Sequence, residues 1–86
     1  DQLLSVDGVF EFIGVHPNSE LVSGLAELSE AGWVKMDSSC MTSVPGLFAA
    51  GDVTDTPLKQ VVTAAGQGAT AAFEALRHVD SGVCAL

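Results

Sequence analysis

One carboxylate in this 86-residue chain stands where it could bind a ligand: Asp52, which follows Gly51 at the end of the apolar run Leu47–Ala50. That run is short and apolar, which indicates a buried strand. Ligands of open α/β sheets bind at the carboxyl ends of strands, and a glycine there lets a ligand approach closely. Asp52 could accept hydrogen bonds from sugar-type hydroxyls, or it could cap a turn. The residues alone leave both interpretations open.

A second candidate site lies at the start of a predicted helix, at Lys59, Gln60 and Val61. The first N–H groups of a helix have no intrahelical partner, and the helix dipole places about half a positive charge at this end. Such an end stabilises negative charge that develops on a bound group.

The stretch Gly66–Ala71, G-Q-G-A-T-A, matches the dinucleotide phosphate turn G-x-G-x-x-A. That motif requires a strand before it and an acidic residue about 20 positions later, at the end of a second strand. Here the preceding residues continue a helical pattern, and the sequence ends before a second strand could form. We therefore interpret Gly66 and Gly68 as positions of close helix packing.

The remaining reactive side chains show no spacing typical of catalysis or metal binding. Cys40 and Cys84 form no C-x-x-C, so we expect neither to exchange disulphides, and we predict no catalytic residue in this chain. His16 precedes Pro17 in a predicted turn, where we interpret it as a loop residue. The scattered histidines and cysteines predict no metal site.

The elements that would position these residues predict an α/β fold. Val44–Leu47 is a predicted turn, because proline presets φ at its second position and glycine accepts positive φ at its third. Leucine and valine spacing over residues 19–28 indicates one or two irregular helical turns, with Ser19 as a possible N-cap. The predicted strands are residues 8–14, 33–36 and 47–50, and residues 81–86 form a tail.

A long final helix begins between Thr56 and Val61, with Thr56 as a credible N-cap and Pro57 at the first helical position. Its apolar residues recur at intervals of three and four: Val62, Ala65, Ala69, Ala72, Phe73, Leu76 and Val79. This continuous stripe, together with neighbouring glycines and alanines, is more apolar surface than one or two short strands can cover.

Size and charge exclude several classes of partner. Eighty-six residues allow one small domain, yet 48% of them are hydrophobic, which suits a core larger than this chain can close alone. A net charge of −8 with three basic residues argues against nucleic acid and anionic membranes. We find no membrane-spanning run and no signal peptide, and the start without Met looks like an interior cut.

Two motifs carry a family resemblance. The runs GLFAAGDV and KQVVTAAGQGATAA strongly resemble the C-terminal part of thioredoxin reductases and of the related flavoprotein subunits of alkyl hydroperoxide reductase. Upstream, FIGVHPNS resembles the return of the family's chain from its nicotinamide domain to its flavin domain. The resemblance extends from roughly Val6 to Val79 and covers only the last part of such an enzyme. The Lys59-Gln60 pair looks more like the alkyl hydroperoxide reductase branch, without deciding between the two.

The resemblance implies the C-terminal piece of a three-layer, Rossmann-like FAD-binding domain. Residues 1–14 would be the last strand of a nicotinamide-binding domain, and residues 15–80 would belong to the flavin domain. Relatives use the aspartate matching Asp52 on the ribityl chain of FAD. They turn the helix end matching Lys59, Gln60 and Val61 toward the pyrimidine edge of the flavin. Gly51 completes the implied FAD site.

The implied parent enzyme is cytoplasmic and transfers electrons from NADPH or NADH through FAD to a thioredoxin-like disulphide protein. Its exchanging C-x-x-C would lie outside this sequence, so we expect the chain alone to be inactive. The implied partner is the remainder of the flavoenzyme or a second copy of the chain. The alternatives are a non-catalytic nucleotide-binding module and a structural, self-associating remnant of such a domain.

Overall fold

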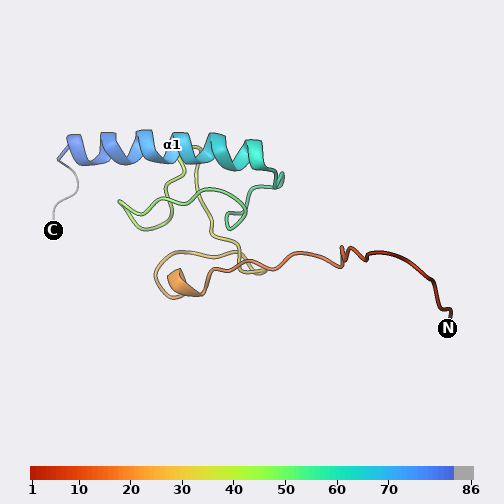
Figure 1. The fold of residues 1–86 in the computed structure, drawn as a ribbon. Helices are drawn as coiled ribbons and strands as arrows, with labels where there is room; N and C mark the ends of the chain where they lie inside the picture. Colours follow the sequence, from red (N-terminus) through yellow and green to blue (C-terminus); the bar gives the residue numbers. More distant parts are fainter. Residues whose placement is uncertain (83–86) are drawn as a thin grey trace.

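The fold is built on one long helix, α1, which spans Val61–Asp80 and lies along one side of an irregular body (Figure 1). The computed structural model describes residues 1–82. The predicted extent of this helix is confirmed, but its predicted N-cap, Thr56, is wrong. Gln60 is the N-cap, and its N–H donates to Thr63 Oγ1 at 3.0 Å. The carbonyl of Thr56 instead accepts a hydrogen bond from Lys59 Nζ at 3.0 Å, in the loop before the helix.

A short hairpin carries the segment that leads to Gly51. Met41 and Phe48 form an isolated antiparallel bridge. The predicted turn Val44–Leu47 is confirmed, because the N–H of its last residue donates to the carbonyl of its first at 3.0 Å. Gly46 has a φ of 89°, as the third position of this turn requires. Leu47–Ala50, predicted as a buried strand, is half-buried and contributes a single bridge.

A second pairing brings three distant segments together around Val34. This residue bridges Leu28 in antiparallel and Thr54 in parallel orientation. The N–H of Val34 donates to Val53 O at 2.9 Å, and the N–H of Asp55 donates to Val34 O at 2.9 Å. Val34 and Thr54 are 3% and 0% exposed, so this pairing is the centre of the small core. The predicted strand at residues 33–36 is thus one isolated bridge position.

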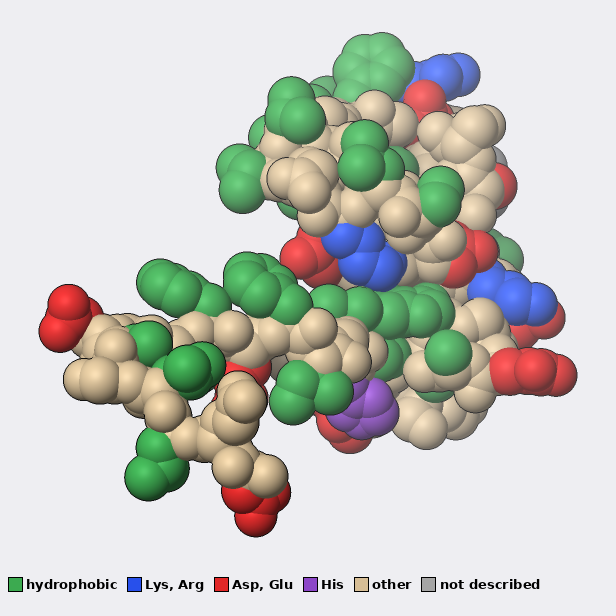
Figure 2. Space-filling view, turned by 90° about the vertical axis from the view of Figure 1, so that its right-hand side faces the viewer, with side chains coloured by type: hydrophobic (Ala, Val, Ile, Leu, Met, Phe, Trp, Pro, Cys, Tyr) green, Lys and Arg blue, Asp and Glu red, His purple; other side chains and the backbone are tan. Residues whose placement is uncertain are grey.

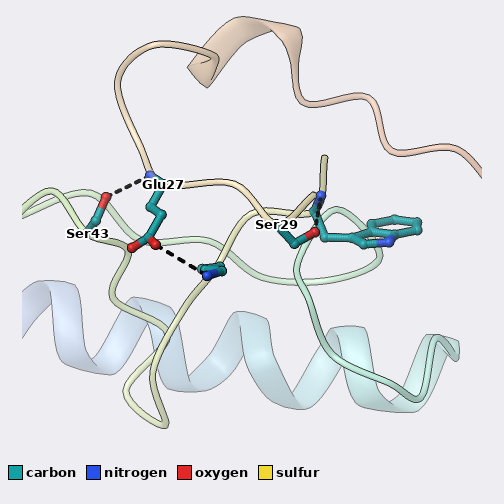
Figure 3. Close-up of polar contacts among 5 residues, drawn as sticks. Glu27, Ser29 and Ser43 are labelled. Carbon is teal, nitrogen blue, oxygen red and sulfur yellow. Dashed lines mark hydrogen bonds and ion pairs between the residues drawn. The ribbon is translucent and has the colours of Figure 1, made fainter. Parts of the chain in front are cut away.

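Polar contacts hold the loops of this body in place (Figure 3). The N–H of Glu27 donates to Ser43 Oγ at 2.7 Å, and the carboxylate of Glu27 lies 3.2 Å from Lys35 Nζ. The N–H of Trp33 donates to Ser29 Oγ at 3.1 Å. These contacts connect residues 27–43 and fix the backbone on which the Trp33 indole stands.

Of the one or two irregular helical turns predicted over residues 19–28, one forms. A 3₁₀ helix, η1, spans Glu20–Val22, and Gly24 with its φ of 86° follows it. Ser19 makes no side-chain capping bond, because its Oγ donates to Gly32 O at 2.7 Å. This bond ties the start of η1 to the loop that precedes Trp33.

Residues 1–16 form an extended arm that leaves the body of the molecule (Figure 1). The radius of gyration is 17.3 Å, whereas a compact chain of this length has about 12 Å. The predicted, nearly buried strand at residues 8–14 is wrong for this structure, since Phe10, Phe12 and Ile13 are exposed. A strand needs a neighbour to receive its backbone hydrogen bonds, and the described residues 1–82 place none beside the arm.

The molecule exposes an unusual amount of apolar surface. Figure 2 shows hydrophobic side chains on one face, both over the end of α1 and along the arm. All residues of the apolar stripe on α1 are exposed, with Val62 at 75% and Phe73 at 60%. The opposite face of the helix packs on the body through half-buried residues, among them Ala64, Gln67 and Ala71. The body therefore leaves the apolar stripe uncovered, as the sequence predicted.

Candidate functional site

The site is organised by a tight turn that begins at Gly51. Gly51 has a φ of 88°, a conformation that side-chain-bearing residues rarely adopt. Its carbonyl accepts hydrogen bonds from the N–H of Thr54 at 3.1 Å and from Thr54 Oγ1 at 2.8 Å. Because Thr54 is fully buried, the turn is anchored in the core. Asp52 lies within this turn and is exposed, so its carboxylate is available to an incoming group.

Lys59 closes the loop between this turn and the helix. Its ammonium donates to three backbone carbonyls, those of Asp52 at 3.1 Å, Thr54 at 2.7 Å and Thr56 at 3.0 Å. These three contacts match the three protons that a lysine ammonium carries. The same nitrogen lies 3.8 Å from the centre of the Trp33 ring, within cation–π range. Lys59 thus brings a positive charge beside Asp52 while holding the loop.

Gln60 and Val61 stand at the amino end of α1 and are both exposed, Val61 to 86%. The first N–H groups of this helix have no partner one turn earlier, and they carry the positive end of the dipole. Lys59 directly precedes this helix end in the chain, and its ammonium lies on the loop carbonyls of residues 52–56. The structure therefore combines a carboxylate, an ammonium and a helix end within one loop and the start of one helix.

An open pocket of about 390 Å³ contains two of the predicted site residues, Asp52 and Lys59. Its full lining consists of Val15, His16, Pro17, Asn18, Trp33, Asp52, Val53 and Lys59. The chain brings residues 15–18 and 52–59 together here, although they are far apart in the sequence. The pocket has an apolar ring, a carboxylate and a fixed cation, which suits a polar group attached to a flat aromatic one.

Sequence reasoning missed Trp33 and Gln67. Trp33 entered the prediction as part of the strand at residues 33–36. It is half-buried, lines the pocket and lies under the Lys59 ammonium. Gln67 belongs to the G-Q-G stretch, and its Oε1 accepts a hydrogen bond from the Gly51 N–H at 2.7 Å. No sequence signal marks either contact, because each joins residues that only the fold brings together.

The G-Q-G glycines do not pack closely within this chain. A Cβ placed on Gly66 or Gly68 would meet nothing within 4 Å. Their side of α1 is open, whereas Gln67 between them turns toward the body. Close packing at these glycines would therefore require atoms other than those of residues 1–82.

Of the predicted bystander cysteines, Cys40 is buried and Cys84 lies outside the described residues. Cys40 has a φ of 63°, and its thiol lies 3.6 Å from Gln67 O. Burial raises the pKa of the Cys40 thiol, and the carboxylates of Asp37 and Glu74 raise it further. These effects keep the sulphur protonated, which is the opposite of what a nucleophilic cysteine needs.

Two other kinds of feature are absent from the part of the chain that the structure describes. Residues 1–82 contain no group of three or more histidine, cysteine or acidic residues placed to hold a metal ion. The helices within that range include none with the length and hydropathy to cross a membrane.

Comparison with known families finds one match that covers most of the chain. A family model described as pyridine nucleotide-disulphide oxidoreductase matches residues 1–68. Among curated proteins, the alkyl hydroperoxide reductase F subunit of Pseudomonas putida is 45% identical over 76 residues, which is 88% of this chain and 15% of that protein. The thioredoxin reductase of Coxiella burnetii is 44% identical over 85 residues, covering 93% of this chain and 27% of that protein.

Solved structures show the same relation. The thioredoxin reductase of Lactococcus lactis in its FR conformation superposes with a TM-score of 0.80 at 43% identity, over 86% of this chain and 24% of its own. The thioredoxin reductase of T. acidophilum superposes with a TM-score of 0.77 at 38% identity, over 93% of this chain and 26% of its own. The chain thus follows the path of about a quarter of these proteins, which confirms a partial α/β domain.

Proposed function

Because the chain belongs to the pyridine nucleotide-disulphide oxidoreductase family, we propose that it forms the ribityl and pyrimidine side of an FAD site in a flavin-dependent disulphide reductase. One observation carries the proposal: Asp52 is an exposed carboxylate in a turn fixed at both ends, next to the amino end of α1. The whole enzyme would resemble thioredoxin reductases and the F subunits of alkyl hydroperoxide reductases. Of these proteins the chain spans 15% to 27%.

Each residue of the proposed site has a distinct role. Asp52 would accept hydrogen bonds from ribityl hydroxyls, and Gly51 would provide the turn that presents it. The amino end of α1, with Gln60 and Val61, would face the pyrimidine edge. It would contribute the helix dipole and the N–H groups of the first helical residues, whereas the N–H of Gln60 itself donates to Thr63 Oγ1. Lys59 would add a fixed positive charge at the same edge, where negative charge develops on reduction.

The residues present fit this part of FAD and no more of it. The carboxylate suits hydroxyl groups, and the pocket beside it contains the flat ring of Trp33. The G-Q-G stretch lies within a helix and cannot form a phosphate turn, and the net charge of −8 would repel a pyrophosphate. The phosphate side would therefore have to come from another part of the enzyme. When bound, FAD would supply the relay of electrons from NADPH or NADH to a disulphide.

Domain organisation follows from the same proposal. Residues 1–14 would be the last strand of a nicotinamide-binding domain, and residues 15–80 would belong to the flavin domain. The extended arm supports this boundary, since it leaves the body before the η1 turn and has no pairing partner within residues 1–82. The electron acceptor would be a thioredoxin-like disulphide protein, and the partner of this chain would be the remainder of the flavoenzyme.

A hybrid enzyme tests the proposal directly. Residues 1–86 would replace the matching segment of the Coxiella burnetii thioredoxin reductase, and flavin content and NAD(P)H-dependent disulphide reduction would be measured. We expect a yellow, active hybrid. Asp52→Ala should weaken FAD binding by about ten- to a hundredfold, because one charge-assisted hydrogen bond is lost.

Asp55→Ala is the matched control for that variant. Asp55 is an exposed aspartate in the same loop. Its backbone N–H donates to Val34 O, and the substitution preserves this hydrogen bond. We expect FAD affinity to stay within about twofold in this variant. Full flavin occupancy with unchanged affinity in Asp52→Ala would show that Asp52 does not bind the cofactor.

The second candidate function is a non-catalytic, self-associating remnant of such a domain. The exposed apolar stripe of α1 and the apolar arm favour it, because both surfaces invite a partner. The visible spectrum of the purified 86-residue polypeptide separates the possibilities. Flavin bands would support a flavin-enzyme segment or a nucleotide-binding module, and a colourless protein would support the structural remnant.

A further inference from the structure

Gln67 contacts the turn that presents Asp52. It lies in the middle of α1, on the face that packs against the body. Its side-chain Oε1 accepts a hydrogen bond from the N–H of Gly51 at 2.7 Å, across 16 positions of sequence. The N–H of Gly51 therefore points toward α1, where Gln67 is its partner.

The backbone of Gln67 contacts the other segment of the same hairpin. Its carbonyl oxygen lies 3.6 Å from the Cys40 thiol. The carbonyl of Cys40 in turn accepts the N–H of Ala49 at 2.9 Å, two residues before Gly51. One helical residue therefore contacts both segments of the hairpin, and this sets the position of α1 along the segment that ends in Gly51.

The contact matters because Gly51 controls the direction of Asp52. The carbonyl of Gly51 is held by Thr54, and its N–H is held by Gln67. With both sides of this residue fixed, the peptide that follows has one orientation, and Asp52 is presented outward.

We propose that Gln67 is a positioning residue, which holds the Gly51 turn so that Asp52 meets the ribityl group of FAD. This inference rests on the proposed flavin site. It also gives the G-Q-G stretch a role other than binding phosphate. The element that matters is the amide oxygen between the glycines, not the glycines themselves, whose Cβ positions face open space.

Two substitutions separate the acceptor oxygen from the rest of the side chain. Gln67→Met keeps the length but removes the acceptor, whereas Gln67→Glu keeps an oxygen at the same position. In the hybrid enzyme we expect Gln67→Met to weaken FAD binding by about five- to tenfold and to alter the visible flavin spectrum. Gln67→Glu should keep the FAD affinity and the flavin spectrum of the unsubstituted hybrid. Thr70→Val, one turn further on the same half-buried face, is the control and should change neither.

A double-mutant cycle tests whether Gln67 acts through Asp52. If it does, Gln67→Met should add little to the loss caused by Asp52→Ala, because the group being positioned is already absent. Losses that add in full would overturn the proposal. So would equal losses in Gln67→Met and Gln67→Glu, or an unchanged FAD affinity and spectrum in Gln67→Met. If Gln67→Met does not fold, Gln67→Asn replaces it, since its oxygen falls one methylene short of Gly51.

Hydrogen exchange of the Gly51 amide provides a readout that needs no flavin. In the 86-residue chain and in the apo hybrid, Gln67→Met should accelerate exchange of this amide by about tenfold, with no change in Thr70→Val. Suppose that the hybrid binds no FAD but that Gln67→Met still accelerates exchange of the Gly51 amide. This result would refute the proposed flavin site and would support the conclusion that Gln67 holds the Gly51 turn. Unchanged exchange in Gln67→Met would refute the positioning role itself.

Discussion

Replacing Lys59 with methionine should release the loop that carries Asp52. The substitution keeps most of the side chain's length and its apolar stem, but it removes the ammonium. With it go hydrogen bonds to the carbonyls of Asp52, Thr54 and Thr56, at 2.7 to 3.1 Å, and the cation–π contact with Trp33 at 3.8 Å. The loop would keep its backbone bonds, so we expect local opening and not global unfolding.

The magnitude follows from the number and exposure of these contacts. A hydrogen bond to a charged group contributes about 1.5–3 kcal/mol, and an exposed cation–π contact contributes about 0.5–1 kcal/mol. The terms do not add, because Lys59 is only half-buried and water can replace the ammonium at the carbonyls. We therefore expect the free energy of local opening to fall by about 2–3 kcal/mol, which corresponds to about 30- to 150-fold faster exchange.

The assay is hydrogen exchange of the Thr54 and Asp55 amides, which donate to Gly51 O and Val34 O in the intact loop. Lys35→Met is the matched control, because Lys35 forms an exposed pair with Glu27 at 3.2 Å. Exposed pairs contribute about 0–1 kcal/mol, so this control should change exchange by less than about fivefold. Equal effects of the two substitutions, or no acceleration in Lys59→Met, would refute the idea that Lys59 holds the loop.

Three further predictions concern the cysteines and the apolar surface. Replacing Cys40 and Cys84 together with serine in the hybrid enzyme should leave disulphide reduction nearly intact, and a collapse in turnover with normal flavin content would contradict it. Burial raises the pKa of the Cys40 thiol above its ordinary 9.0, so the unfolded chain loses this proton at a lower pH than the folded chain. The free energy of unfolding should therefore be unaffected below pH 9.0 and should fall as the pH rises from 9.0 toward the raised pKa. Chemical denaturation with and without Cys40→Ser should show this fall only when the thiol is present. The 86-residue chain should self-associate in sedimentation at micromolar concentration, and Phe73→Ser with Leu76→Ser should weaken the association, whereas a compact monomer would refute it.

The sequence by itself determined the features whose causes are local. The turn at Val44–Leu47 follows from proline and glycine at adjacent positions, and the structure confirms its hydrogen bond and positive φ. The helix Val61–Asp80 follows from apolar residues that recur at three and four. The family was also readable, because GLFAAGDV and KQVVTAAGQGATAA keep their order and spacing.

The exact start of the helix was not decided locally. Thr56 and Gln60 can both accept hydrogen bonds at a helix start, and Pro57 favoured the earlier one. The structure begins the helix after Gln60, because Lys59 folds back onto the carbonyls of residues 52–56 and keeps them in a loop. That bend depends on Trp33 and Thr54, which the sequence does not place beside Lys59.

Strands and packing faces were decided only by tertiary structure. A strand exists when another segment receives its hydrogen bonds, so residues 8–14 stay an exposed arm despite their β-rich composition. The periodicity of the sequence likewise predicted an apolar face and a small-residue face on α1. It could not predict which of these faces packs on the rest of the chain. The body packs on the side of Ala64, Gln67 and Ala71, and the apolar stripe faces outward. Pairing and burial depend on which surfaces lie nearby, whereas turns and helices depend mainly on their own residues.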